Sequence, residues 1–544
     1  MSNPTKYSGC KEATGKTNEA FELDFLPGKN SADSAKGNIT QRCQNEIIYE
    51  EEVDFETALE KTGFGKFNIF LLLLSFPASC ASTFDTASLP YVLPTASCDL
   101  NLTGYDRGLL NGAIYTGMLT SSFIWGSLSD TFGRQKLLAV GYLLDACFSI
   151  GASLSQSKWA MFAFKFLSGC AIAGPFSMIM TYMSEMFSKK YRDSIVLSSG
   201  IYMSLGGVIQ PMIAIALIPK TMSWEILDGG IVICSWRIFL ILSAVPALIS
   251  GILTAFCVES PKFLLAKGNK TKALQTFQYM YSVNTGKPRE TYPVKSLRNE
   301  VQTQNQRDNN SSSQSFVKTI GSAFTHPHLK HTFLCCGLQF LALNSLNTIR
   351  LWLPLLFHYI ESIGGEPLNT CEAIARNDGP QPTDCSKVSV NESIYMQVMY
   401  TNLTTAIFMS LSSYIVKCVG KKILMVCGFV ISAAIAIAMP WLNASYAIYL
   451  ACLYLGLVNA GVLGVIGLAV ELFPTSIRTL AVSLTMTSGR IGVVLGSIAL
   501  PLFLSFSCWA PFMIISILCT LCAVIIYFTV PGSTNKRTES AVIS

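Results

Sequence analysis

Five charged side chains interrupt long apolar stretches of the sequence. They are Asp85, Asp145, Lys165, Arg350 and Arg490. An unpaired charge near the centre of a lipid bilayer costs roughly 2.5–3.5 kcal/mol, so a charge in such a position is usually paired or functional. The chemistry open to these residues is therefore ion pairing, proton transfer or the binding of a charged solute inside a membrane.

Two further charged pairs recur at a fixed distance along the chain. EMFSKKYR begins at Glu185 and ends at Arg192. ELFPTSIR begins at Glu471 and ends at Arg478, 286 positions further on (471 − 185 and 478 − 192). The stretches FGRQK and VGKK, which precede the two pairs, are offset by nearly the same amount. This repeat indicates two halves that arose from one ancestral unit, an arrangement typical of secondary transporters.

The composition places these residues in a membrane protein. Of the 544 residues, 51% are hydrophobic and 13% are charged, whereas an average soluble domain is about 25% charged. A helix that spans a bilayer needs roughly 20 mainly apolar residues. Twelve runs meet this requirement, near 67–93, 108–129, 137–156, 159–186, 194–218, 236–258, 331–357, 394–416, 422–441, 446–472, 479–505 and 508–530. The sequence therefore predicts an all-α polytopic membrane protein with twelve transmembrane helices.

Polar segments divide the chain into five expected parts. A cytoplasmic N-terminal segment (1–66), which contains no signal peptide, precedes the first six-helix bundle (67–258). A cytoplasmic linker (259–330) leads to the second six-helix bundle (331–530), and a short cytoplasmic tail (531–544) follows. The division into six and six helices agrees with the internal repeat.

The positions of Lys and Arg predict the orientation in the membrane. With the N-terminus placed inside, the short inner loops contain nine Lys and Arg and the outer loops six, while the long linker adds eleven inside. Because Lys and Arg concentrate on the cytoplasmic side, we expect both termini to be cytoplasmic. Three glycosylation sequons begin at Asn101, Asn391 and Asn443 in predicted outer loops, which agrees with this orientation.

Most of the 18 cysteines lie inside apolar runs, where a small core residue is expected. Cys371 and Cys385 differ, because both stand in the polar loop between the seventh and eighth runs. Two outcomes remain open for them, a disulfide and a pair of free thiols. The disulfide would require this loop to face an oxidising compartment.

At the end of the second run, the sequence resembles the major facilitator superfamily. Its signature G-x-x-x-D-x-x-G-R is matched by Gly126, Asp130, Gly133 and Arg134. The resemblance implies a fold of twelve helices in two pseudo-repeats and a charge network that closes the cytoplasmic side in one state. That network would contain Asp130, Arg134, Glu185 and Arg192 in the first half, with Glu471 and Arg478 acting in the second half. The alternative is that these charges only orient the helices.

Four stretches resemble a narrower branch of this superfamily. They are FETALEKTGFGKF (55–67), FDTASLPYVLP (84–94), SWRIFLILSAVP (235–246) and ESPKFLLAKGNKTKAL (259–274). Together they are similar to the synaptic vesicle glycoprotein 2-like branch, and in particular to its insect-type members. This branch is related to organic cation and anion transporters. Larger members carry a glycosylated domain between helices seven and eight, where this chain has only a short loop.

The resemblance also implies where a solute would bind. In the superfamily, helices one, four, seven and ten line a central cavity, which favours Asp85, Lys165 and Arg350 as cavity residues and gives Asp145 a structural role. Lys165 stands where the helix-four motif R-x-x-x-G has arginine, so the charge is kept and the bidentate fork is lost. If Asp85 and Lys165 pair, the cavity is net positive and suits an organic anion better than a cation.

Three further residues are candidates for solute binding. Arg490, in TSGRIG, resembles a helix-eleven pattern of organic ion carriers, and it either bonds neighbouring carbonyls or contacts the solute. Asn344 and Asn347 could supply hydrogen bonds.

Other classes of function are disfavoured by the sequence. It has no Walker-type phosphate loop, no H-E-x-x-H motif and no cysteine–histidine metal cluster, so neither an enzyme, nor a metal site, nor a cofactor is expected. The net charge of +6 is small for this length and indicates no nucleic-acid partner. We expect a monomer in lipid that moves a small organic solute, with a coupling ion such as a proton. The alternative is a transport fold kept as a regulatory protein of synaptic or secretory vesicles, and the sequence does not separate the vesicle from the plasma membrane.

Overall fold

The structure is almost entirely helical, as the sequence predicts. Within the described residues the sheet content is one antiparallel hairpin, β1 (Ser223–Ile226) with β2 (Ile231–Cys234). An all-α membrane fold is therefore confirmed, with this short hairpin as an addition. The computed structural model describes residues 52–220, 223–226, 231–298, 325, 328–361, 369–372, 391–473 and 477–530.

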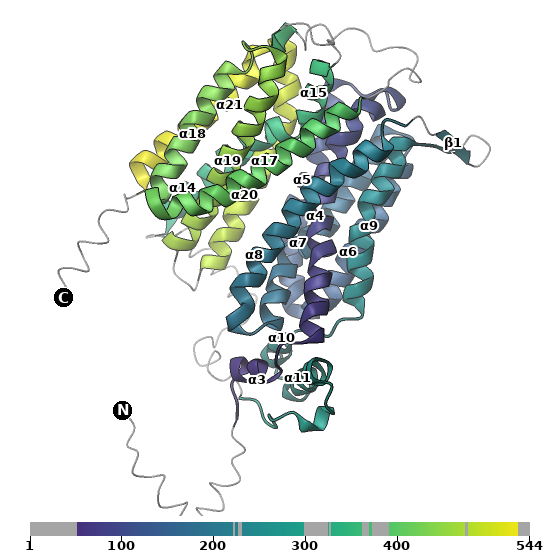
Figure 1. Cartoon of the computed structure of the whole chain (residues 1–544), viewed down its shortest axis with the longest axis vertical. Coiled ribbons are helices and arrows are strands. Elements are labelled where there is room, and N and C mark those ends of the chain that lie inside the picture. Colours follow the sequence, from purple (N-terminus) through teal and green to yellow (C-terminus); the bar gives the residue numbers. More distant parts are fainter. Residues whose placement is uncertain are drawn as a thin grey trace, which may run out of the picture.

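The first half of the chain forms six long helices (Figure 1). They are α4 (Lys66–Asp99), α5 (Gly104–Phe132), α6 (Arg134–Leu154), α7 (Lys158–Met186), α8 (Lys189–Leu217) and α9 (Ser235–Ala255). Each coincides with one of the first six apolar runs.

The second half repeats this arrangement. Its helices are α14 (Leu329–Arg350), α15 (Leu353–Glu361), α17 (Glu392–Val419), α18 (Lys421–Ala438), α19 (Ala444–Leu472), α20 (Arg478–Phe506) and α21 (Trp509–Thr529). The seventh apolar run is divided between α14 and α15 by a turn at Leu351 and Trp352, and the other five runs each form one helix.

Ten helical segments of the described chain are long and apolar enough to cross a membrane. The remaining two long helices, α5 and α17, have 29 and 28 residues and carry seven Ser and Thr each. Many of these hydroxyls donate to a carbonyl one turn earlier, as Ser121 does to Gly117 at 3.0 Å, so they add no unsatisfied group. Both helices pack against the opposite half, α5 on α20 and α17 on α8, which explains their higher polarity.

The two ends of the molecule differ. At one end, below the first half, lie the short helices α3 (Phe55–Lys61), α10 (Pro261–Ala266) and α11 (Lys270–Thr285) and the turn η2 (Arg289–Thr291). We name this the linker end and the opposite end, which carries β1 and β2, the hairpin end (Figure 1). Phe55 packs on Phe277 with ring centroids 5.8 Å apart, so the segment before α4 is docked on the linker.

The two halves meet in the middle and toward the hairpin end. Tyr395 donates its hydroxyl to the carbonyl of Tyr91 at 3.2 Å. Asn402 Nδ2 donates to the Gly207 carbonyl at 2.6 Å, and a Cβ added at Gly108 would lie 2.6 Å from the Ser497 carbonyl oxygen. All these residues lie in the hairpin-side part of their helices, and Figure 1 shows the two groups of helices leaning apart toward the linker end.

Small residues let α5 and α7 pack closely within the first half. A Cβ added at Gly169 would lie 2.9 Å from the Cα of Ile114, and one at Gly117 would lie 2.8 Å from the amide nitrogen of Cys170. Close backbone contact of this kind is how helices associate in lipid, where burial of apolar surface gives little drive.

Replacing Gly169 by Ala should lower the stability of the protein by about 1–3 kcal/mol, because the added methyl group overpacks a backbone contact. The matched control is Gly337→Ala, an exposed helical position where an added Cβ meets no atom within 4 Å. That change should leave stability unchanged or raise it by roughly 0.5–1 kcal/mol. Thermal unfolding in detergent measures both, and equal melting temperatures for the two variants would contradict the packing described.

Candidate functional site: a central cavity and a buried charge cluster

A cavity of about 390 Å³ lies between the two halves. Its walls come from α4 and α8 of the first half and from α14, α15, α17 and α19 of the second. It extends from Tyr91 and Pro354 on the hairpin side to Gly200 and Leu463, which are nearer the linker end. The first, seventh and tenth membrane helices (α4, α14 with α15, and α19) therefore line the cavity, as expected. The fourth helix, α7, contributes no lining residue, and α8 and α17 line the cavity in its place.

Arg350 stands on the cavity wall, as expected. It is the last residue of α14, next to the turn that precedes α15, and its side chain is exposed. Among the described residues that line the cavity, it is the one charged side chain. The uncharged polar lining consists of Thr83, Tyr91, Ser204, Gln210, Asn402, Thr405 and Asn459.

Two of the other candidates, Asn344 and Asn347, lie away from the cavity, which corrects the expectation for them. Asn347 is buried and donates to the Leu343 carbonyl of its own helix at 3.1 Å. Asn344 faces α20, since its Oδ1 would lie 3.0 Å from a Cβ at Gly496. Both residues therefore contribute to packing inside the second half, because they lie on a side of α14 that faces other helices and not the cavity.

Arg490 also lies outside the cavity lining. Its guanidinium donates to the hydroxyl of Ser122 on α5 and lies 5.8 Å from the ring centroid of Phe176 on α7. The contact joins the two halves near the middle of the molecule. Arg490 is thus positioned to hold α20 against the first half.

Asp85 and Lys165 form a buried ion pair. Lys165 Nζ lies 2.8 Å from Asp85 Oδ1. Lys165 is 1% exposed and Asp85 is 5% exposed. Lys165 also donates to Ser88 at 3.1 Å. The hypothesis that these charges pair is confirmed, whereas the expectation that they line the cavity is wrong for this structure. The pair lies inside the first half, where each charge neutralises the other.

Asp145 belongs to the same cluster, although the sequence favoured a purely structural role for it. Ser168 Oγ lies 2.6 Å from Asp85 Oδ2 and 2.7 Å from Asp145 Oδ1. A serine hydroxyl has one hydrogen and can donate to one acceptor only. If Ser168 donates to one carboxyl group, the other must be protonated and must donate to Ser168. The geometry therefore contains a place for one exchangeable proton, and Asp145, which is 1% exposed, forms no ion pair of its own within the described residues.

The signature residues near the linker end form a second network. Gly133 separates α5 from α6 with φ of 96°, a conformation that favours glycine. Arg134 pairs with the buried carboxylate of Glu185, which also accepts a hydrogen bond from Ser260 at 2.7 Å. Glu259 accepts the backbone N–H of Arg134 at 3.0 Å and so caps α6. Sequence reasoning did not identify Glu259. Its negative charge is favourable at the N-terminus of α6, where the helix dipole is positive.

In this conformation Arg192 pairs outside that network, and its expected part in a network that closes the cytoplasmic side in one state stays a prediction. Its guanidinium binds Glu56 at 2.9 Å and the Ser184 carbonyl at 2.8 Å. It therefore joins α8 to α3 in the segment before the first spanning helix. Gly126 is exposed with open space around it, and the side chain of Asp130 lies outside the described residues.

The second half has a matching but weaker arrangement. Gly420 has φ of 89° between α17 and α18, and Lys421 pairs with Glu471 at 3.2 Å. Glu471 is exposed, with its side chain at 65%. Arg478 begins α20, and its side chain lies outside the described residues. The pairs Arg134–Glu185 and Lys421–Glu471 each act within one half, so each stiffens its own bundle in this conformation.

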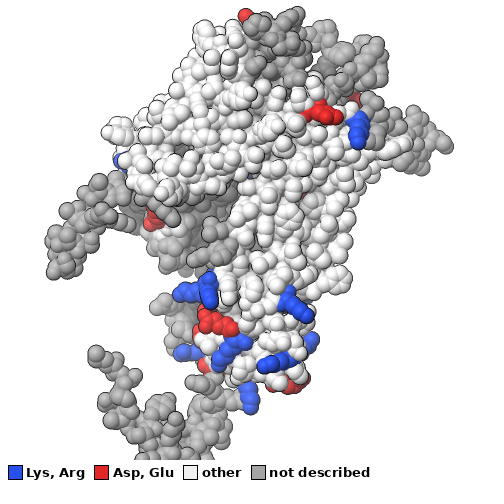
Figure 2. Space-filling model, in the orientation of Figure 1, with Lys and Arg blue, Asp and Glu red and all other residues white. Residues whose placement is uncertain are grey.

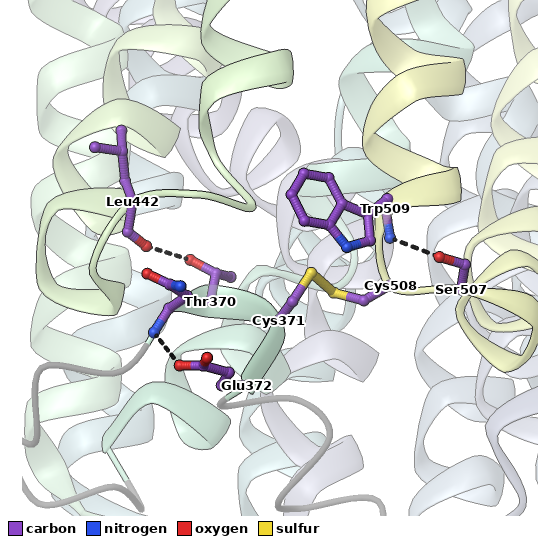
Figure 3. Close-up of a disulfide and its surroundings, with 8 residues drawn as sticks. Thr370, Cys371, Glu372, Leu442, Ser507, Cys508 and Trp509 are labelled. Atoms are coloured by element: carbon purple, nitrogen blue, oxygen red, sulfur yellow. Dashed lines mark hydrogen bonds between the residues drawn. A yellow bond between two sulfur atoms is a disulfide. The ribbon is translucent and has the colours of Figure 1, made fainter.

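The disulfide differs from the expected one. Cys371 is bonded to Cys508, in the turn before α21, with the two Cα atoms 5.6 Å apart; Cys385 lies outside the described residues. Figure 3 shows that Thr370, next to Cys371, donates to the Leu442 carbonyl, and that the disulfide lies beside Trp509. Cys98 is also disulfide-bonded. Spacing in the sequence cannot reveal such pairings, because they depend on which loops meet at the hairpin end.

The three sequons lie at the same end as the disulfide. Asn101 is exposed in the turn between α4 and α5, and Asn391 and Asn443 are exposed residues that precede α17 and α19. All three asparagines are thus accessible at the hairpin end, and their glycosylation stays a prediction.

Digestion without reducing agent should yield a cross-linked peptide pair that contains Cys371 and Cys508, separate from the one that contains Cys98. Replacing Cys508 by Ser should make Cys371 reactive toward maleimide and lower the stability by about 2–4 kcal/mol, because the cross-link restrains the unfolded chain. Cys147→Ser, which removes an exposed free thiol, is the control and should leave stability unchanged. Mass spectrometry that finds Cys371 joined to Cys385 would contradict the pairing.

Comparison with known proteins agrees with this architecture. Residues 68–360 match the family described as sugar (and other) transporter, and residues 387–542 match the major facilitator superfamily. The chain is also similar in fold to the D-xylose–proton symporter, with a TM-score of 0.60 and 14% identity over 86% of this chain and 98% of that one. An inward-open structure of the xylose transporter XylE from E. coli gives the same values.

Curated relatives support the narrower resemblance. Synaptic vesicle glycoprotein 2B of Rattus norvegicus is 29% identical over 45% of this chain and 36% of the relative. Synaptic vesicle glycoprotein 2C of Mus musculus is 26% identical over 56% and 42%, and glycoprotein 2A of Rattus norvegicus is 24% identical over 60% and 46%. The matched region spans less than half of the length of these relatives. The repeat, the helices and the matched families together show that the chain belongs to the major facilitator superfamily, in its sugar (and other) transporter family.

Proposed function

We propose that the protein is a secondary transporter that moves a small organic solute by alternating access. The observation that carries this proposal is the central cavity, whose walls come from both halves of the chain. A solute held there contacts two rigid bundles at once, so rocking of one bundle against the other exposes it to either side. One chain supplies the whole cavity, so a monomer in lipid is sufficient.

The proposed orientation places the linker end in the cytoplasm. Figure 2 shows Lys and Arg gathered at that end, below a broad surface on which few charged side chains appear. The disulfide and the three sequons lie at the opposite end, which suits an extracellular or luminal compartment. The closer approach of the halves toward the hairpin end makes this an inward-facing state.

We further propose a proton as the coupling ion, held by the cluster of Asp85, Asp145 and Lys165. One cation and two carboxyl groups leave a net negative charge in the membrane interior unless one carboxyl group is protonated, and burying a net charge is costly. Asp85 lies on the opposite face of α4 from Thr83 and Ala87, which line the cavity. A change of protonation therefore acts on the helix that forms one wall of the solute site.

The relatives named as synaptic vesicle glycoproteins favour a second candidate, a regulatory protein of vesicle membranes that keeps the fold without transport. Uptake separates the two candidates. The purified full chain is placed in proteoliposomes and offered a pooled library of organic solutes with and without an imposed proton gradient. Accumulation that the gradient drives supports the transporter. No accumulation by correctly inserted protein would favour the regulatory candidate.

Two variants test the proton site. Asp145→Asn imitates the protonated state, so solute exchange at equal concentrations should persist while accumulation driven by a proton gradient is lost. Asp85→Asn leaves Lys165 buried without its partner, so both exchange and accumulation should fall by tenfold or more, on the order of the cost of breaking a buried pair. Gradient-driven accumulation that is unchanged in Asp145→Asn would overturn this assignment.

A further inference from the structure

The charge of the central cavity has a definite sign. Of the described residues on its wall, Arg350 is cationic and none is acidic. Lys165, which the sequence also favours as a cavity cation, is paired with Asp85 inside the first half. Within the described chain, Arg350 has no ion pair or side-chain hydrogen bond, and its side chain is exposed at the end of α14. The cavity therefore presents one guanidinium whose charge the surrounding protein does not neutralise.

A second group on the wall lacks a protein partner. Gln210 is fully buried, and its Nε2 donates to the Phe84 carbonyl at 2.8 Å. Its Oε1 is buried and accepts no hydrogen bond from the described protein. A buried acceptor without a donor costs about 1–3 kcal/mol. Because Gln210 lines the cavity, rotation of its amide group toward the cavity would let a donor on a bound solute satisfy Oε1.

The remaining wall is mainly apolar. Met203, Leu346, Val398, Met409 and Leu455 surround the polar groups. A volume of about 390 Å³ lies within the range of small-molecule sites, roughly 300–1,000 Å³. Such a site accommodates a solute with an apolar body and a few polar groups, and it is unsuited to a highly charged one.

We propose that the cavity selects an organic monocarboxylate with an apolar body and at least one hydroxyl or amide N–H donor. Arg350 binds the carboxylate, because the guanidinium fork matches both carboxylate oxygens. Gln210 Oε1 accepts the hydrogen bond from the donor group. This inference rests on the proposed solute site, and it adds the chemical class of the solute.

Binding to the full chain in nanodiscs tests the sign of the charge. Three probes share one body and differ in charge, namely 4-hydroxyphenylacetate, its neutral amide and the cationic tyramine. Calorimetry should show the carboxylate binding about 10- to 100-fold more tightly than the amide, with tyramine weakest. Equal affinities, tighter binding of tyramine, or no binding of any probe at millimolar concentration would each overturn the inference.

Substitutions assign the preference to Arg350. Arg350→Gln should remove the advantage of the carboxylate over the amide, and binding of the amide then reports that the variant is folded. Arg350→Lys should keep part of the advantage, since it retains the charge and loses the fork. Lys220→Gln removes one exposed positive charge at the hairpin end and should leave all affinities unchanged. An undiminished preference for the carboxylate in Arg350→Gln would contradict the role of this residue.

The second contact has its own test. The intact protein should bind 4-hydroxyphenylacetate more tightly than phenylacetate, and Gln210→Leu should abolish this difference. Uptake into proteoliposomes separates this inference from transport. Carboxylate binding that depends on Arg350 without any uptake would overturn transport alone. Uptake confined to neutral or cationic solutes and indifferent to Arg350→Gln would support transport and overturn the carboxylate.

Discussion

The structure depends on keeping buried charge neutral inside a membrane. Asp85 and Lys165 lie 2.8 Å apart in the first half, and their mutual attraction offsets the cost of removing both from water. Asp145 adds a second carboxyl group, linked to the first through the single hydroxyl of Ser168. The same need for neutrality that holds α4, α6 and α7 together thus places two carboxyl groups on one hydroxyl, which is the arrangement on which the proposed proton site rests.

The cavity and the cluster are connected by α4. This helix carries Asp85 toward α6 and α7, and Thr83 and Ala87 toward the solute cavity. Because opposite faces of one helix carry the two sites, the proposed coupling needs no intervening loop. Arg350 lies on the other side of the cavity and belongs to the other half, so a bound anion would bridge the two bundles.

In this conformation, the ion pairs Arg134–Glu185 and Lys421–Glu471 near the linker end each join helices of one half, and neither links the two halves. Arg134 and Glu185 join the ends of α6 and α7, and Lys421 and Glu471 join α18 and α19. The first pair is reinforced by Ser260 and Glu259, whereas the second is exposed, which limits the stabilisation it gives. Contacts between the halves lie instead in the middle and toward the hairpin end, where Tyr395 meets Tyr91. Each half is therefore firm by itself, which is what rigid-body rocking requires.

The sequence by itself determined the membrane class, the positions of the long helices and the two-fold repeat. Apolar length and charge spacing are local properties, and lipid forces every such segment to satisfy its own backbone. It also identified Arg350 and the pairing of Asp85 with Lys165, because an isolated charge in lipid needs a partner. Only the tertiary structure decided which faces of the helices meet. That choice joined Asp145 to the cluster, removed Asn344, Asn347 and Arg490 from the cavity, and bonded Cys371 to Cys508. Each of these depends on contacts between segments distant in the chain, which periodicity along one segment does not encode.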